Sequence, residues 1–131
     1  MHSNEKLIRD IFASFADGDL DGVLDRCTDD VLFRLPGSGR VAGDYRGREE
    51  FLTKLLPAFA SIADMSTFSE RAEMVACDDD YGMALLTQSF TRLDGRAVEY
   101  RIVPVMSFRD GLLSAFEEWA GNEAEYDDAW A

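Results

Sequence analysis

The sequence predicts an α+β domain in which three N-terminal helices pack on one face of a curved, mostly antiparallel sheet. Apolar residues recur at helical spacing before residue 61, whereas the rest of the chain carries the pattern of long strands. Asp-Gly pairs, which are strong hairpin signals, separate the last three of these strands. The chain has 131 residues, a usual length for one domain, and we assign residues 1–131 to a single domain.

Three helices are predicted in the first part of the chain. Residues 4–16 place five apolar side chains along one stripe of a helix. Asp19 can cap a short second helix, because its carboxylate accepts hydrogen bonds from the free N–H groups at a helix start. Residues 48–60 repeat the spacing of the first helix. Pro57 lacks a backbone donor, so we expect it to kink or shorten this third helix.

The strand pattern begins between the second and third helices and dominates the rest of the chain. The predicted strands are 31–35, a short edge segment 41–45, and then about 67–77, 81–93, 97–108 and 112–120. The pairs Asp94-Gly95 and Asp110-Gly111 predict tight hairpins. A curved sheet covered by helices on one face leaves a concave space wherever the helices do not fill it.

Charge and histidine content exclude several classes of function. Thirteen Lys and Arg residues stand against 26 Asp and Glu residues, which leaves a formal net charge of −13. This balance argues against nucleic acid as a partner, because that affinity comes from phosphate neutralisation, and against an anionic membrane surface. The single histidine, His2, lies near the start of the chain, so histidine-based triads, zinc sites and general bases are nearly excluded.

Cysteines, metal motifs and targeting signals add little. Cys27 and Cys77 belong to no Cys-x-x-Cys pair, and we expect reduced side chains, although their separation in sequence leaves a bridge open. The run 78–80 of three aspartates lacks the spaced ligands of a calcium loop. We therefore expect no metal and no cofactor. The polar start of the chain lacks the apolar core of a signal peptide, so the expected compartment is the cytoplasm.

Strand alternation sorts the candidate functional residues. If Phe116 faces inward, Glu118 does so too, while Glu117 faces the other way. The same parity turns Gln88 and Tyr100 inward on the neighbouring strands, so these two residues and Glu118 are our candidate catalytic residues. A carboxyl group in an apolar pocket has a raised pKa and can act as an acid or base near neutral pH. The residues expected to line the substrate pocket are Phe33, Leu35, Tyr45, Phe90, Met106 and Phe116.

Each candidate also has a plain structural interpretation. Glu118 can be one of two exposed acids on a strand, beside Glu117. Tyr100 can pack its ring in the core and point its hydroxyl at water. Tyr45 either lines the mouth of the pocket or anchors the loop before the third helix. Trp130 is expected to pack against the body of the protein or a partner subunit rather than to bind a ligand.

Several local strings resemble a known family. They are FADGDLD at 15–21, TDDV at 28–31, AGDYRG at 42–47 and FRDG at 108–111. In this order they resemble the SnoaL-like and ketosteroid-isomerase-like families of the nuclear-transport-factor-2-like (NTF2-like) superfamily. The resemblance implies a cystatin-like cone with a pocket between sheet and helices. It also implies a homodimer formed through the outer face of the sheet.

The resemblance also tests known chemistries position by position. The carboxylate base, tyrosine donor and protonated aspartate of a ketosteroid isomerase fall on Leu35, Ile11 and about Pro104. Abstraction of a proton beside a carbonyl needs a base and a donor for the enolate oxygen, so that apparatus is excluded. Of the polar trio of limonene-epoxide-hydrolase-like members, only the last carboxylate has a counterpart, Glu118.

Three functions stay open at this point. The first is a SnoaL-like protein with an apolar pocket for a small hydrophobic molecule, ring-containing or polyketide-like, with no reaction assigned. The second is an enzyme of cyclase, isomerase or hydrolase type that uses Glu118 as acid or base, with Tyr100 and Gln88 orienting the substrate. The third is a non-catalytic dimeric binding module.

Overall fold

The helices precede most of the sheet, as the apolar spacing predicts. In the computed structural model, which describes residues 1–131, α1 (Ser3–Ala16) is followed by the short α2 (Leu20–Leu24). The side chain of Asp19 caps α2 by accepting a hydrogen bond from the Gly22 N–H at 3.0 Å. These helices form because their apolar residues share one face, which they turn toward the sheet.

The third predicted helix is irregular in its middle. It comprises α3 (Gly47–Glu50), a π-helical turn η1 (Phe51–Leu55) and α4 (Leu56–Ala60) without a break. Pro57 follows the π-helical turn directly and supplies no N–H to the backbone ladder. The disturbance expected at Pro57 is therefore a widened turn within one continuous helix rather than an end of the helix. Phe51 and Leu55 of this turn point into the core.

Six strands form one mixed sheet. Their bounds are β1 (Cys27–Leu35), β2 (Gly43–Arg46), β3 (Ala63–Cys77), β4 (Tyr81–Arg92), β5 (Ala97–Arg109) and β6 (Leu112–Ala120). The order across the sheet is β2-β1-β6-β5-β4-β3, and β1 and β6 run parallel while all other neighbours are antiparallel. A C-terminal helix, α5 (Glu123–Ala129), follows the last strand. The mostly antiparallel sheet is confirmed, and α5 is a helix beyond the three expected.

The hairpins lie where the Asp-Gly pairs predict them. Asp110 and Gly111 have φ values of 54° and 76°, so both occupy the left-handed region that a tight β5–β6 turn requires. Gly95, with φ of 89°, has the same role between β4 and β5. The turns fix the register of the long strands and thus decide which side chains share a face.

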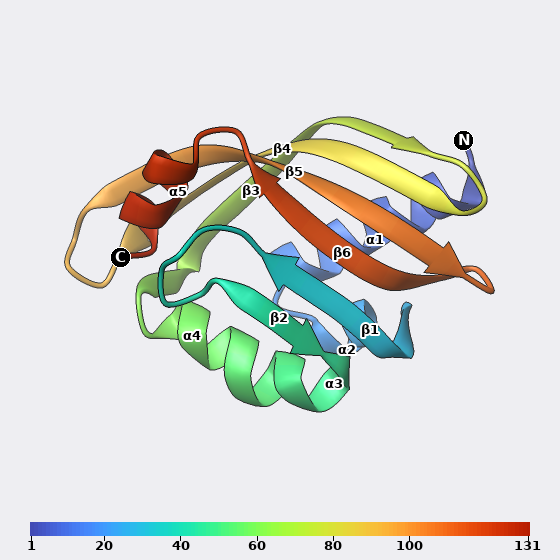
Figure 1. The fold of residues 1–131 in the computed structure, drawn as a ribbon, viewed down its shortest axis with the longest axis horizontal. Helices are drawn as coiled ribbons and strands as arrows, with labels where there is room; N and C mark the ends of the chain where they lie inside the picture. The colour runs from blue at the N-terminus through green and yellow to red at the C-terminus, as the bar shows by residue number, and fades with distance from the viewer.

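The sheet arches over the helices (Figure 1). Register irregularities in β1, β3 and near the start of β6 interrupt the ladder and bend the strands. The inner face carries the core, with Leu86, Ile102 and Met106 fully buried. The outer face of the long strands leaves Tyr81 and Trp119 each 63% exposed. No helix has the length and apolar content that a membrane crossing requires.

Candidate functional site

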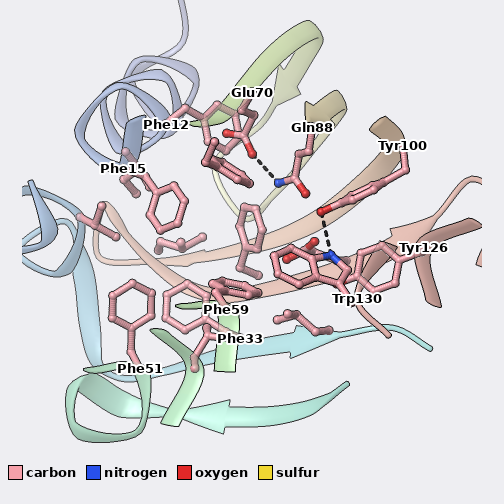
Figure 2. A pocket seen from close by; sticks show the side chains of 18 residues that line it. Phe12, Phe15, Phe33, Phe51, Phe59, Glu70, Gln88, Tyr100, Tyr126 and Trp130 are labelled. Carbon is pink, nitrogen blue, oxygen red and sulfur yellow. Dashed lines mark hydrogen bonds between the residues drawn. The ribbon is translucent and has the colours of Figure 1, made fainter. Parts of the chain in front are cut away.

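A cavity opens between the inner face of the sheet and the helices. Eighteen residues line it, and 15 of them are hydrophobic. The empty space amounts to about 660 Å³ with its mouth included, of which about 70 Å³ is wide enough for the centre of a water molecule. The lining contains ten aromatic residues: Phe12, Phe15, Phe33, Phe51, Phe59, Phe68, Tyr100, Phe116, Tyr126 and Trp130. Concave apolar sites with a few polar groups are typical of small-molecule binding (Figure 2).

A row of polar side chains crosses the roof of this cavity on three adjacent strands. Glu70 of β3 pairs in register with Gln88 of β4, and Gln88 pairs with Tyr100 of β5. The Gln88 side-chain amide donates a hydrogen bond of 2.6 Å to the Glu70 carboxyl (Figure 2). The amide is thereby oriented by a carboxyl group rather than by water.

Glu118 completes the polar set from β6. Its partner in register on β5 is Pro104, whose ring supplies no N–H to the ladder. Protein atoms surround the carboxyl group, and the surface that stays accessible belongs to the cavity that it lines. No group of the chain donates a hydrogen bond to it, and because no fully buried side-chain oxygen is left unpaired, its oxygens keep some accessible surface. Of the two interpretations open for Glu118, the structure supports the one in the pocket.

Desolvation dominates the electrostatics of the two carboxyl groups. Burial, and to a smaller extent the negative charge of Glu70, together raise the pKa of Glu118 from 4.5 to about 8. Burial also raises the pKa of Glu70, against the hydrogen bond from Gln88, which lowers it. Glu118 is therefore mostly protonated at neutral pH, and its carboxyl group can donate as well as accept a hydrogen bond.

Tyr100 is held by the C-terminal part of the chain. The indole Nε1–H of Trp130 donates a hydrogen bond of 2.9 Å to the Tyr100 hydroxyl (Figure 2). Burial and the nearby Glu118 carboxyl raise the pKa of Tyr100. Of the two interpretations open for Tyr100, the one in which the hydroxyl points at bulk water is wrong. Because the hydroxyl accepts from Trp130, its own proton stays available for donation.

The segment after β6 closes one end of the cavity. The ring of Trp130 packs against Phe59 and Phe90, with centroid distances of 4.9 and 4.4 Å. Arg92 ties this segment to β4 by donating a 2.7 Å hydrogen bond to the carbonyl oxygen of Ala129. Trp130 packs against the body, as expected, and it also lines the cavity.

The predicted site residues divide into two groups. Glu118, Tyr100 and Gln88 lie together in the cavity wall, and so do three of the expected substrate-binding residues, namely Phe33, Leu35 and Phe116. Ile11, at the position of the isomerase donor, also lines the cavity, and no polar group replaces that donor. The roles in binding or catalysis that the sequence assigns to these six predicted residues stay predictions.

Three residues expected to line the pocket do not reach it. Trp130 covers Phe90, so this ring belongs to the layer behind the wall. Met106 is fully buried in the core beneath the sheet. The Tyr45 hydroxyl donates to the carbonyl oxygen of Val41 at 2.9 Å, which makes Tyr45 an anchor of the loop before α3.

Glu70 is a polar cavity residue that sequence reasoning missed. It shares strand parity with Phe68, and both line the cavity, so the signal was the alternation within β3. The aromatic residues of α1, Phe12 and Phe15, were assigned to an apolar helix stripe, and that stripe faces the cavity. Tyr126 enters the wall from α5.

A second hollow lies beside the cavity on its outer side. Phe15 and Phe68 line both spaces, and their rings meet edge to face with centroids 5.4 Å apart. This ring pair is therefore a wall between the outer hollow and the inner cavity. The outer hollow is bounded by the end of α1 at Asp17 and by the start of β3 at Met65.

Neither thiol chemistry nor a metal cluster is built into the site. Both cysteines are free, and burial raises the pKa of the Cys27 thiol to about 12, so Cys27 is not a thiolate at neutral pH. No three His, Cys, Asp or Glu side chains are grouped so as to hold a metal ion. The polar chemistry of the cavity is confined to two carboxyl groups, one amide and the two tyrosine hydroxyls.

A curved sheet, helices on its inner face and an apolar internal cavity define the NTF2-like class of proteins. The sequence profile of the SnoaL-like domain matches residues 8–116, which is most of the chain. The protein therefore belongs to the SnoaL-like family, and the resemblance noted in the sequence is confirmed. Among the curated proteins, none matches this sequence.

Solved structures share this fold at low sequence identity. An NTF2-like protein of unknown function from Burkholderia pseudomallei is 21% identical, with a TM-score of 0.88 over 100% of this chain and 99% of that one. TerC, co-crystallised with polyporic acid, is 18% identical, with a TM-score of 0.86 over 98% of each chain. A provisionally assigned polyketide cyclase from Xanthomonas campestris is 16% identical, with a TM-score of 0.76 over 98% of this chain and 97% of that one. They confirm the fold class.

Proposed function

We propose that this protein binds a small, apolar, ring-containing molecule in the cavity between sheet and helices. The observation that carries the proposal is the composition of the wall, in which 15 of 18 residues are hydrophobic and the polar groups converge on one side. Burial of apolar ligand surface drives such binding, and the few polar groups orient the ligand. The co-crystallisation of TerC with polyporic acid supports a ligand with rings in a cavity of this fold.

The shape of the cavity limits the ligand that fits without rearrangement. The widest part, about 70 Å³ open to the centre of a water molecule, suits one ring with a short side chain. The rings of Phe33 and Phe116, with centroids 6.2 Å apart, form one wall against which a ligand ring can pack. A ligand with two or more rings requires the wall between Phe15 and Phe68 to open toward the outer hollow.

A second candidate function is acid–base catalysis on the bound molecule. The observation in its favour is Glu118, whose pKa of about 8 lets the carboxyl group donate a proton at neutral pH and take one back. The Tyr100 hydroxyl can donate a hydrogen bond to an oxygen on which charge develops. Leu35 and Ile11 stand where a ketosteroid isomerase has its base and its tyrosine donor, and neither can act as one. Glu118 is therefore the acid or base in the proposed reaction.

We also propose that two copies of the chain associate through the outer face of the sheet. Four large hydrophobic side chains are exposed in the structure on β3, β4 and β6: Met74, Tyr81, Met83 and Trp119. Exposed apolar side chains gathered on one face are typical of association surfaces. Sedimentation equilibrium of the protein and of a Trp119→Asp variant tests this, because the aspartate should shift the variant to monomer.

Native mass spectrometry of protein purified from its own host tests the binding proposal. We expect a population with an added mass below a few hundred daltons that is released on unfolding. A Leu35→Trp variant, which fills the cavity, should lack this mass, whereas Glu117→Gln on the opposite face of β6 should keep it. A bound mass that persists in Leu35→Trp would place the ligand outside the cavity and contradict the proposal.

A further inference from the structure

The ionisable side chains of the cavity wall include acids but no bases. Among its 18 residues are two carboxyl groups, Glu70 and Glu118, and no Lys, Arg or His. Most arginines of the chain instead form ion pairs outside the cavity; Arg34, for example, bonds Asp44 at 2.8 Å and lies 3.5 Å from Glu117. The protein therefore contains no positive group that neutralises the acids of the cavity.

The Glu118 carboxyl group lacks any partner in the chain. Gln88 satisfies one oxygen of Glu70, at 2.6 Å, but no donor reaches Glu118. A buried ionised carboxylate is costly unless it is paired, so Glu118 needs either a proton or a cation beside it. In the free protein a proton neutralises the Glu118 carboxyl group. The cavity beside this group leaves room for a different positive group.

The remaining wall also favours a cation. Ten aromatic rings surround the cavity, and their faces carry the negative part of the ring quadrupole. Figure 2 shows Phe12, Tyr100, Tyr126 and Trp130 arranged around the same space as Glu70. Ammonium groups bind in such aromatic cages when a carboxylate lies nearby. The net charge of −13 attracts cations to the protein and repels anions from it.

We propose that the ligand of this cavity is an aromatic amine whose ammonium group lies beside Glu118 while its ring packs among the phenylalanines. This inference rests on the proposed function and names the chemical class of the ligand. A carboxylic acid or another anionic ring compound should bind more weakly than the amine, because its negative charge would add to that of the same carboxyl groups. The neutral alcohol of the same size binds through its ring and one hydrogen bond only.

Binding of the ammonium displaces a proton from the protein. In the free protein at pH 7 the Glu118 carboxyl carries a proton, because its pKa is about 8. When the ammonium binds, the O–H bond of this carboxyl breaks, the proton passes to the buffer, and the ammonium keeps its own protons. Glu70 is the charged group that raises the pKa of Glu118, and Glu118 in turn raises the pKa values of Tyr100 and Tyr126. The walls from α1 and β1 contribute none.

Isothermal titration calorimetry with three probes of equal size tests the inference. The probes are 2-phenylethylamine, 2-phenylethanol and phenylacetate, each at pH 7 in phosphate and in Tris buffer. We expect the amine to bind at least about ten-fold more tightly than the alcohol, and phenylacetate more weakly than both. The apparent enthalpy for the amine should differ between the buffers by an amount that corresponds to nearly one released proton, whereas the alcohol should show no difference.

Two matched variants separate this inference from the proposed function. Glu118→Gln should lose the preference for the amine over the alcohol and release no proton, whereas Glu117→Gln should behave like the unchanged protein. Equal binding of amine and alcohol by the unchanged protein would contradict the proposal of an amine ligand. It would still agree with the proposal that the cavity binds an apolar ring. Tighter binding of phenylacetate would also overturn the proposal of an amine ligand. Failure of all three probes to bind would overturn both proposals.

Discussion

Replacing Glu118 by Gln should stabilise the folded protein in a way that grows with pH. In the unfolded chain this carboxyl ionises around 4.5, whereas in the folded protein it ionises only near 8. Between these pH values the folded state binds more protons than the unfolded state, so the free energy of unfolding falls as pH rises. The destabilisation caused by the raised pKa of Glu118 is absent below pH 4.5 and complete above pH 8.

The size of the effect follows from the difference between the two pKa values. Holding Glu118 in the cavity costs about 3 kcal/mol at pH 7 and about 5 kcal/mol above pH 9. Gln has nearly the same shape and no charge, so Glu118→Gln should gain about that much and gain almost nothing at pH 4.5. These gains are a large part of the usual 5–15 kcal/mol, roughly, that stabilise a domain.

Urea unfolding followed by tryptophan fluorescence at pH 4.5, 7 and 8.5 measures this difference. Glu117→Gln is the control, because Glu117 lies on the outer side of the same strand, 3.5 Å from Arg34. The control should show no gain that increases with pH. A constant difference between Glu118→Gln and the unchanged protein at all three pH values would show that Glu118 ionises freely, and would refute the buried position assigned to it.

Three further predictions concern the wall and the surface. Trp130→Phe removes the indole donor of Tyr100, and we expect urea unfolding to show a loss of about 1–3 kcal/mol, whereas an unchanged midpoint would mean that the bond adds nothing. Phe68→Ala removes one ring of the wall between the two hollows, so stopped-flow fluorescence should show faster association of 2-phenylethanol, and an equal rate would contradict a wall at this place. Arg34→Gln breaks an exposed ion pair with Asp44, and its urea midpoint should stay close to that of the unchanged protein, because water and salt screen such pairs.

Much of the fold and part of the site could be predicted from local patterns. Helical spacing and Asp-Gly turns give the positions of the helices and hairpins because both are determined by neighbours in the sequence. Strand alternation places Gln88, Tyr100 and Glu118 on one face, since hairpins with regular register preserve parity from strand to strand. The parallel pairing of β1 with β6 depends on distant segments, and no local signal indicates it.

Strand alternation predicts which face of the sheet a side chain lies on, but not whether it lines the cavity or lies in the core behind the cavity wall. Phe90 and Met106 have the predicted parity, yet Trp130 covers Phe90, and Met106 lies at the bottom of the core. The position of Trp130 depends on α5, which docks against strands far earlier in the chain. Sequence spacing says nothing about such a contact between distant elements.

Glu70 was missed because its strand is irregular and rich in charge. Glu70, Arg71 and Glu73 follow one another closely, and register shifts after Asp64 and after Ala72 interrupt the alternation on both sides of this segment. Glu73 pairs with Arg101 on the outer side, at 2.7 Å, whereas Glu70 enters the cavity. Alternation places the two acids on opposite faces, and the pairing of Glu70 with Gln88 shows which face is the inner one.

The crystal structure of the protein soaked with 2-phenylethylamine tests the central claim most directly. The account predicts the ring in the cavity against Phe33 and Phe116, with the nitrogen within hydrogen-bond distance of the Glu118 carboxyl. Leu35→Trp, soaked in the same way, should show no ligand there. A ligand on the outer face of the sheet beside Trp119, or a cavity that stays empty while the probe binds in solution, would contradict it.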